Sequence, residues 1–130
     1  MILDTTFVID LMNNDKEAIE KLSKLSTKEG SIFITSLTIF EVFRGVNRSQ
    51  KPVEEKKKIN ATLENQLTLD FDDKSAEKAG EIDRELISEG KIIDPIDCMI
   101  AGIALVKKEK VLTRNIKDFS RISGLEVETY

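Results

Sequence analysis

The sequence has 130 residues, of which 40% are hydrophobic and 34% are charged, and its formal net charge is −4. This length and apolar fraction suit one domain with a real core, so we expect a single domain over residues 1–130 and exclude a multidomain protein. With no histidine and one cysteine, the chain excludes an intramolecular disulfide, a Cys/His zinc site and nucleophilic catalysis of the Ser-His or Cys-His kind.

Neither a membrane span nor a secretory signal is expected. No stretch approaches the ~20 apolar residues of a membrane helix, because Asp4, Asp10 and Asp15 interrupt the N-terminal apolar run. No basic segment precedes an apolar one, as it would in a signal peptide. The lone Cys98 suits a reducing compartment and is interpreted as a small core residue. We therefore expect a cytoplasmic protein with no membrane association.

The first half of the chain alternates short apolar runs with helical patterns. The expected elements, in chain order, are a strand at 1–3, a helix at 6–12, a helix capped by Asp15 with Ala18, Ile19, Leu22 and Leu25 on its apolar face, a strand at 31–35, a helix capped by Ser36, a helix from Pro52 and a strand at 67–71. Gly30 is expected to end the second of these helices.

The second half continues the alternation. Asp72 or Asp73 is expected to open a helix, and Asp94-Pro95 combines a capping carboxylate with a proline in the first turn. The expected elements are a helix with Ala76, Ala79, Ile82 and Leu86 on one stripe, a helix from 95 to about 108, a strand at 111–113, a short helix at 116–119 and an edge strand at 125–128. This order predicts an α/β sandwich around a mostly parallel sheet flanked by helices.

Acidic residues stand where such a sheet forms its sites, just beyond the carboxyl ends of the strands. Asp4 follows the first strand, and Asp118 follows the strand that ends at Thr113. Glu41 and Asp97 lie on or beside the apolar faces of their predicted helices. These four carboxylates are therefore candidates for one shared site.

Carboxylates that converge in a partly buried place repel one another and raise their own pKa values, and a divalent cation relieves that repulsion. Ligation by oxygen alone selects Mg²⁺ or Mn²⁺ over zinc. The six glycines form neither a P-loop nor a dinucleotide-binding motif, so a nucleotide cradle is not expected.

Each acid also has a structural interpretation. Asp94 and Asp97 could both satisfy free N–H groups at the start of one helix, an interpretation that we favour for Asp94. Asp4 could be a turn residue, and Glu41 could pair with an arginine further along its helix. From spacing alone, the metal site and these alternatives both stay open.

A basic segment contrasts with the acidic whole. Residues 44–58 contain six basic and two acidic residues, so the segment carries +4 and the remainder −8. The basic residues are Arg44, Arg48, Lys51, Lys56, Lys57 and Lys58. They predict either a contact surface for a polyanion or partner, or an ordinary solvated helix surface.

Four ordered motifs resemble those of the PIN-domain nucleases. They are residues 2–10 (ILDTTFVID), 36–42 (SLTIFEV), 97–101 (DCMIA) and 112–119 (LTRNIKDF), followed by 123–125 (SGL). The motifs lie in register over essentially the whole chain, and they are most similar to the VapC-type toxins of toxin–antitoxin pairs.

The resemblance implies a PIN-like three-layer sandwich and an Mg²⁺- or Mn²⁺-dependent endoribonuclease that hydrolyses RNA phosphodiester bonds. It implies Asp4, Asp97 and Glu41 as metal ligands. The family often has aspartate at a fourth position, which is Asn115 here. Either Asp118 substitutes for it, or the site uses three acids and an amide.

Further roles follow from the same resemblance. Asp94 is a possible additional acid, and Thr5, Thr6 and Thr113 are expected to hydrogen-bond the ligands or a substrate phosphate. The basic segment would hold the RNA backbone or meet an antitoxin.

The resemblance also implies partners: an RNA substrate, a small antitoxin protein and a second copy of the chain in a homodimer. Phe40 and Phe43 are expected to fill the core.

Two alternatives to this function stay open. Asn115 and the negative net charge are compatible with a catalytically inactive PIN-like module that binds RNA or protein, and the same acidic site could cleave DNA.

Overall fold

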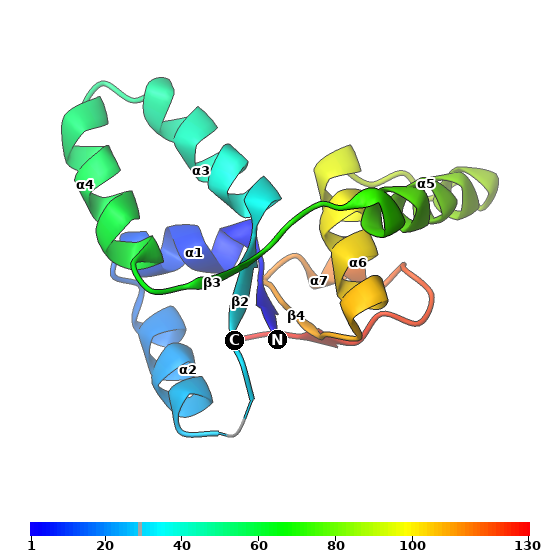
Figure 1. Cartoon of the computed structure of the whole chain (residues 1–130), viewed down its shortest axis with the longest axis horizontal. Helices are drawn as coiled ribbons and strands as arrows, with labels where there is room; N and C mark the ends of the chain where they lie inside the picture. Colours follow the sequence, from blue (N-terminus) through cyan, green and yellow to red (C-terminus); the bar gives the residue numbers. More distant parts are fainter. Residues whose placement is uncertain (29) are drawn as a thin grey trace.

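The structure is a computed structural model that describes residues 1–28 and 30–130. In these residues five strands form one parallel sheet with the order β3-β2-β1-β4-β5 (Figure 1). The strands are β1 (Ile2–Leu3), β2 (Phe33–Thr35), β3 (Leu67–Leu69), β4 (Val111–Leu112) and β5 (Val127–Glu128). The predicted parallel α/β fold is confirmed.

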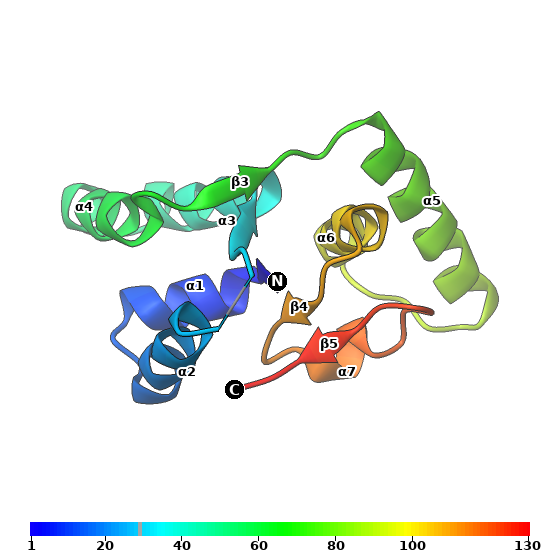
Figure 2. The ribbon, with the colours of Figure 1, turned by 60° about the horizontal axis from the view of Figure 1, so that its bottom comes forward.

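Helices connect the strands and cover both faces of the sheet. They are α1 (Thr5–Met12), α2 (Lys16–Ser26), α3 (Ser36–Asn47), α4 (Pro52–Leu63), α5 (Asp73–Ser88), α6 (Pro95–Lys107) and α7 (Ile116–Phe119). Figure 2 shows α1 and α2 on one side of the strands and α5 and α6 on the other. The arrangement is the expected three-layer sandwich, and no helix of residues 1–28 and 30–130 has both the length and the apolar character to span a bilayer.

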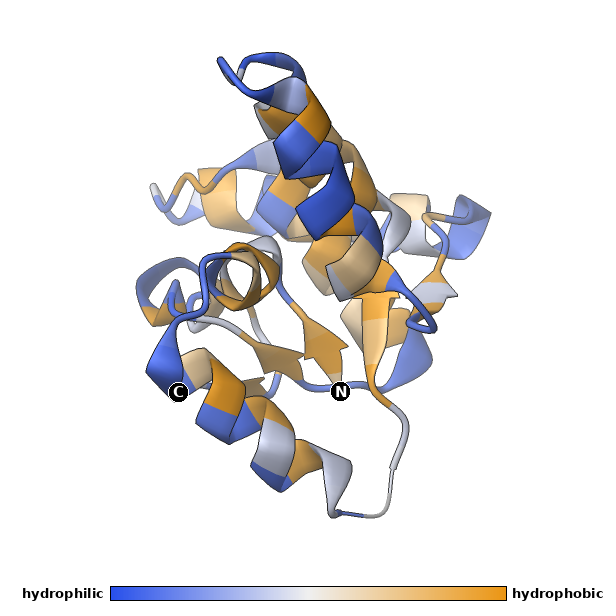
Figure 3. Ribbon diagram, turned by 90° about the vertical axis from the view of Figure 1, so that its left-hand side faces the viewer, coloured by the Kyte–Doolittle hydropathy of each residue, from blue (hydrophilic) through white to orange (hydrophobic). Residues whose placement is uncertain are grey.

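The pleat of the short strands divides the core into two clusters. Ile2 and Val111 pack with α5, α6 and α7 on one face, whereas Leu3 and Leu112 pack with α1 to α4 on the other. Successive side chains of a strand point to opposite faces, so both residues of each pair are buried. In Figure 3 the strands are accordingly largely hydrophobic, while the surrounding helices mix both colours.

Three helices begin at the aspartates that the sequence indicates. The side chains of Asp15, Asp72 and Asp94 accept hydrogen bonds from backbone N–H groups two or three residues later, at 3.0, 2.8 and 2.8 Å. Each carboxylate therefore satisfies a donor that the first helical turn leaves without a partner.

The cap expected at Ser36 is wrong by one residue. Thr35 caps α3, since its Oγ1 accepts a hydrogen bond from the Thr38 backbone N–H at 3.1 Å. The Ser36 hydroxyl instead accepts from the backbone N–H of Phe71 at 3.3 Å. Ser36 thus bonds to the residue that follows Asp70, beyond β3, and not to the start of its own helix.

Three expected core positions are also wrong. Phe40 is 54% exposed because the buried stripe of α3 contains Thr38 and Val42, and a residue midway between them points about 200° away. Ile19 is 47% exposed. Ala76 is also exposed, and Ser75 is the buried residue in the first turn of α5. Phe43, by contrast, packs against the core as expected.

The topology places a crevice at the carboxyl end of β1. From β1 the chain proceeds outward through β2 to β3, and it then crosses back to add β4 and β5 on the other side. Strand order therefore reverses between β1 and β4, where open α/β sheets form their binding crevices.

Candidate active site

Asp4 lies at that crevice, directly after β1. It is only 2% exposed, and although it occupies the N-cap position of α1, its side chain makes no capping hydrogen bond. Its Oδ2 accepts hydrogen bonds from the hydroxyls of Thr113 at 2.7 Å and Thr6 at 3.0 Å. Two hydroxyls from separate elements therefore hold this carboxylate, and it does not serve the helix start.

Glu41 approaches from the second turn of α3. Its Oε1 accepts a hydrogen bond from the Thr5 hydroxyl at 2.6 Å, and its Oε2 lies 3.8 Å from the Arg44 guanidinium. Burial raises the pKa of Glu41, the Thr5 hydrogen bond opposes that shift, and the charge of Asp4 adds to it. The expected ion pair of Glu41 with an arginine of its helix is therefore present, and the same side chain lies near Asp4.

Asp97 stands in the first turn of α6 and faces the same crevice. Its Oδ2 accepts a hydrogen bond from the side-chain amide of Asn115 at 3.2 Å. The amide of Asn115 also donates to Oδ2 of Asp118 at 3.1 Å. The structure therefore brings Asn115 and Asp118 together beside Asp97.

Burial and the charges of the other acids both act on Asp97. Its pKa is raised to about 7, first by burial and then by the negative charges of Asp4, Asp94, Glu41 and Asp118. Like charges have this effect only at short range in a partly buried place. Five carboxylates from four parts of the chain thus share one electrostatic environment.

Asp94 plays the structural role that the sequence favours. Its residue is exposed, and its Oδ1 accepts the hydrogen bond from the Ile96 backbone N–H that caps α6. Its charge still reaches Asp97 and Glu41, whose pKa values it helps to raise.

The three threonines named from the sequence all contact the acids or each other. Thr5 holds Glu41, while Thr6 and Thr113 hold Asp4. Sequence reasoning missed Thr38, a fully buried residue whose hydroxyl lies 3.2 Å from that of Thr5. The cluster of hydroxyl residues that directly follows β2 is the sequence signal that could have found it.

The basic segment spans the end of α3, the connection that follows it and the first half of α4. All six basic side chains belong to exposed residues: Arg44, Arg48, Lys51, Lys56, Lys57 and Lys58. Arg44 joins this surface to the acids, since its guanidinium lies near Glu41 and 5.3 Å from the centroid of the exposed Phe40 ring.

The donors at the crevice suit a hard divalent cation, because they are carboxylate, amide and hydroxyl oxygens. Among residues 1–28 and 30–130, however, no three acidic or cysteine side chains could hold a metal ion as they stand. The Asn115 amide now occupies carboxylate oxygens of Asp97 and Asp118. The chemistry of the donors therefore fits a cation, and their present spacing does not enclose one.

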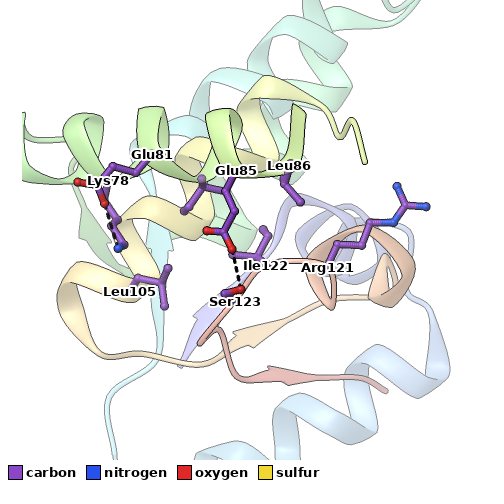
Figure 4. A pocket seen from close by; sticks show the side chains of 9 residues that line it. Lys78, Glu81, Glu85, Leu86, Leu105, Arg121, Ile122 and Ser123 are labelled. Atoms are coloured by element: carbon purple, nitrogen blue, oxygen red, sulfur yellow. Dashed lines mark hydrogen bonds and ion pairs between the residues drawn. The ribbon is translucent and has the colours of Figure 1, made fainter. Parts of the chain in front are cut away.

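The hollow in Figure 4 lies apart from these acids. It is a cavity of about 110 Å³ lined mainly by α5 and residues 121–123. Four of its polar side chains pair with each other: Lys78 lies 3.1 Å from Glu81, and Ser123 donates to Glu85 at 2.9 Å. Arg121, which also lines the cavity, lies 3.9 Å from Asp118. The cavity contains none of the predicted site residues.

Comparison with known proteins identifies the family of this chain. The family model for the PIN domain matches residues 1–125. The chain is 30% identical to the tRNA(fMet)-specific endonuclease VapC of Shigella flexneri over 129 residues, which cover 99% of this chain and 96% of that protein. It is also 30% identical to ribonuclease VapC2 of Rickettsia felis over the same shares.

Solved structures show the same likeness in three dimensions. The chain matches VapBC2 from Rickettsia felis, bound to a promoter DNA fragment, with a TM-score of 0.92 and 30% identity over 99% of this chain and 97% of that one. It matches DNA-bound VapBC from Salmonella typhimurium with a TM-score of 0.88 and 31% identity over 98% and 96%. The chain therefore belongs to the PIN-domain family and, within it, to the VapC group.

Proposed function

We propose that this protein is a divalent-metal-dependent endoribonuclease and the toxin of a toxin–antitoxin pair. The observation that carries the proposal is the convergence of Asp4, Glu41, Asp97 and Asp118 at the crevice, where burial first and then the charges of the other acids raise the pKa of Asp97 to about 7. The names of the relatives, an endonuclease and a ribonuclease, support it.

Asp4, Asp97 and Glu41 would hold Mg²⁺ or Mn²⁺, with Asn115 and Asp118 beside them. Such a cation lowers the pKa of bound water and neutralises charge on the phosphoryl oxygens. The chain contributes orientation: hydroxyls of Thr6 and Thr113 fix the Asp4 carboxylate, and the Thr5 hydroxyl fixes Glu41.

The substrate that we propose is RNA, held by the basic residues of α3 and α4. Arg44 stands nearest the acids, 3.8 Å from Glu41, and the other five cations extend along the exposed surface. Phosphates of the RNA backbone bound on this surface would place the neighbouring nucleotides near the crevice.

The partner that we propose is an antitoxin whose apolar helix covers grooves beside α1. One groove of about 270 Å³ is lined by α1, α2 and the end of α4, and includes Leu11, Leu22 and Leu63. Another of about 220 Å³ lies between α1, α3 and α4 and reaches Glu41. An amphipathic helix fits such grooves, and the solved VapBC complexes of related proteins support a partner of this kind. We also propose a cytoplasmic homodimer.

A catalytically inactive binding module is the second candidate, and one observation favours it. The amide at position 115 donates hydrogen to two carboxylates, and the acids do not enclose an ion as they stand. Such a module would gain no stability from a divalent cation, whereas a metal enzyme would.

The test is cleavage of a structured RNA pool by the purified protein in Mn²⁺ or in EDTA. We expect cleavage only with metal and a loss of at least about 100-fold for Asp4→Asn and for Asp97→Asn. Asp72→Asn is the matched control, because Asp72 caps α5 and is not among the acids that shift the pKa of Asp97. DNA of the same sequence is tested in parallel.

Parent-like cleavage by Asp4→Asn and Asp97→Asn would refute the assignment. If the parent does not cleave the pool, titration of its melting temperature with Mn²⁺ separates the two candidates. A rise indicates an enzyme selective for another RNA, and no change indicates the inactive module.

A further inference from the structure

Arg114 lies between two residues of the candidate site but points away from it. Its chain neighbours are Thr113, which donates to Asp4, and Asn115, which donates to Asp97. Arg114 thus occupies the middle of the loop that supplies two of the hydrogen bonds to the acids.

The guanidinium of Arg114 is held by acids of the N-terminal helices. Its Nε lies 3.4 Å from Oδ2 of Asp10, and one terminal nitrogen lies 3.0 Å from Asp15 and 2.9 Å from Glu17. Three carboxylates around one cation leave a local charge of −2. This arginine is therefore already neutralised and is a poor ligand for phosphate.

An aromatic ring completes the arrangement. The guanidinium lies 4.7 Å from the centroid of the Tyr130 ring, and the Tyr130 hydroxyl donates to the same Asp10 oxygen at 2.6 Å. The ring of Tyr130 also packs edge-on against the buried Phe7 at 4.6 Å. Tyr130 therefore joins the C-terminal end of the chain to α1.

Hydrogen bonds also hold the loop on either side of Arg114. Thr113 is fully buried and its hydroxyl donates to Asp4, while the backbone N–H of Asn115 donates to the Thr113 hydroxyl at 2.9 Å. Strand β4 ends at Leu112, the Thr113 backbone N–H donates to the Glu128 carbonyl at 3.0 Å, and the Arg114 backbone N–H reaches the Thr6 hydroxyl only at 3.5 Å. A shift of this loop would move the Thr113 hydroxyl and the Asn115 amide together.

From this geometry we infer that Arg114 is a positioning residue: with Tyr130 it clamps residues 113–115 onto α1 and α2 and so sets the geometry of Asp4 and Asn115. A planar guanidinium suits the role, because it can stack on a ring while its fork pairs with carboxylates, which a lysine cannot do. In its consequence for catalysis the inference rests on the proposed function.

The chain offers a matched control in the Lys21–Glu128 ion pair. This pair, at 2.5 Å, also joins α2 to the last strand; Glu128 contacts the 113–115 loop through its backbone carbonyl, which accepts from the Thr113 N–H and which a substitution of Lys21 leaves in place. Lys21→Met therefore removes a comparable tie between the same parts of the fold without touching the clamp.

The experiment compares Arg114→Met, Arg114→Lys and Lys21→Met. We expect Arg114→Met to weaken Mn²⁺ binding ~10-fold and to lower kcat for RNA cleavage by a similar factor, with little change in KM. Arg114→Lys should recover only part of the loss. Lys21→Met should reduce the melting temperature and leave Mn²⁺ binding and kcat unchanged.

A third measurement requires neither metal nor activity. The side-chain amide signals of Asn115, observed by NMR in EDTA, should shift and exchange faster in Arg114→Met and stay parent-like in Lys21→Met. A parent that neither cleaves RNA nor gains stability from Mn²⁺ would overturn the proposed function and leave this readout intact. Parent-like Asn115 signals in Arg114→Met, or equal effects in Lys21→Met, would overturn the positioning role.

Discussion

The side-chain amide of Asn115 donates a hydrogen bond to Oδ2 of Asp97, the acid whose pKa is raised to about 7. The side chain next to this carboxylate is therefore neutral and donates a hydrogen bond to it. At this position the chain has an amide, which relieves repulsion between the neighbouring carboxylates in the absence of a cation.

Asn115→Asp should make the site depend more strongly on metal. We expect the metal-free variant to lose about 1–3 kcal/mol of stability at pH 8, because a hydrogen-bond donor becomes another negative charge. Mn²⁺ should raise its melting temperature more than that of the parent. Thermal unfolding in EDTA and in Mn²⁺ measures both effects. Asn60→Asp, an equal charge change at an exposed position of α4, should show neither.

The stability of the metal-free protein should fall as pH rises from about 4 to about 7. The pKa of Asp97 is 3.8 ordinarily and about 7 in the folded protein, so between these values the folded state holds a proton that the unfolded state has lost. The free energy of unfolding therefore decreases as pH rises through this window and levels off above it. Asp97→Asn should remove the fall and be about 2 kcal/mol more stable than the parent at pH 8, after a discount for the partial exposure of Asp97. Urea unfolding at pH 5 and pH 8 in EDTA measures this, and an equal pH dependence in parent and variant would contradict it.

Thr113→Val should cost about 1–3 kcal/mol, because it removes the 2.7 Å hydrogen bond to a buried carboxylate while keeping the shape of the side chain. Thr62→Val removes a hydroxyl that donates to a backbone carbonyl on the surface of α4, and it should cost less than half as much. Urea midpoints at pH 8 compare the two. Similar losses would show that the Thr113 bond has no special weight.

Gly102→Ala should strongly destabilise the packing of α5 on α6. A Cβ at this position would lie 2.6 Å from the backbone oxygen of Ser75 and 3.0 Å from the backbone nitrogen of Ala79, neither of which can yield easily. We expect a loss of about 2–3 kcal/mol. Gly80→Ala, on the facing helix with nothing within 4 Å, should instead gain about 0.5–1 kcal/mol through helix propensity. Thermal denaturation of both variants checks the contrast in sign.

Structural features that depend on a few neighbouring residues, such as helix caps and short strands, could be predicted from the sequence. Asp15, Asp72 and Asp94 cap helices because a free N–H lies two or three residues ahead of each. The apolar runs of β1 and β4 became strands that are buried on both faces. The placement of Asp4 after the first strand followed from the same periodicity, since the carboxyl end of a parallel strand opens onto the crevice.

Features that depend on residues far apart in the chain were decided only by the tertiary structure. The sequence left Asn115 and Asp118 as alternatives, and the fold places both beside Asp97 through one amide. The contact between Arg114 and Tyr130 had no local pattern to predict it.

The capping of α3 and the exposure of Phe40 belong to the same class. Ser36 and Thr35 have similar intrinsic preferences for a cap, and a backbone N–H from Phe71 takes the Ser36 hydroxyl. The buried face of α3 was set by the elements that pack against it. The local sequence thus determined where most helices and strands begin and which acids follow the strands. The partners of each side chain were determined by the elements that the folded sheet brings together.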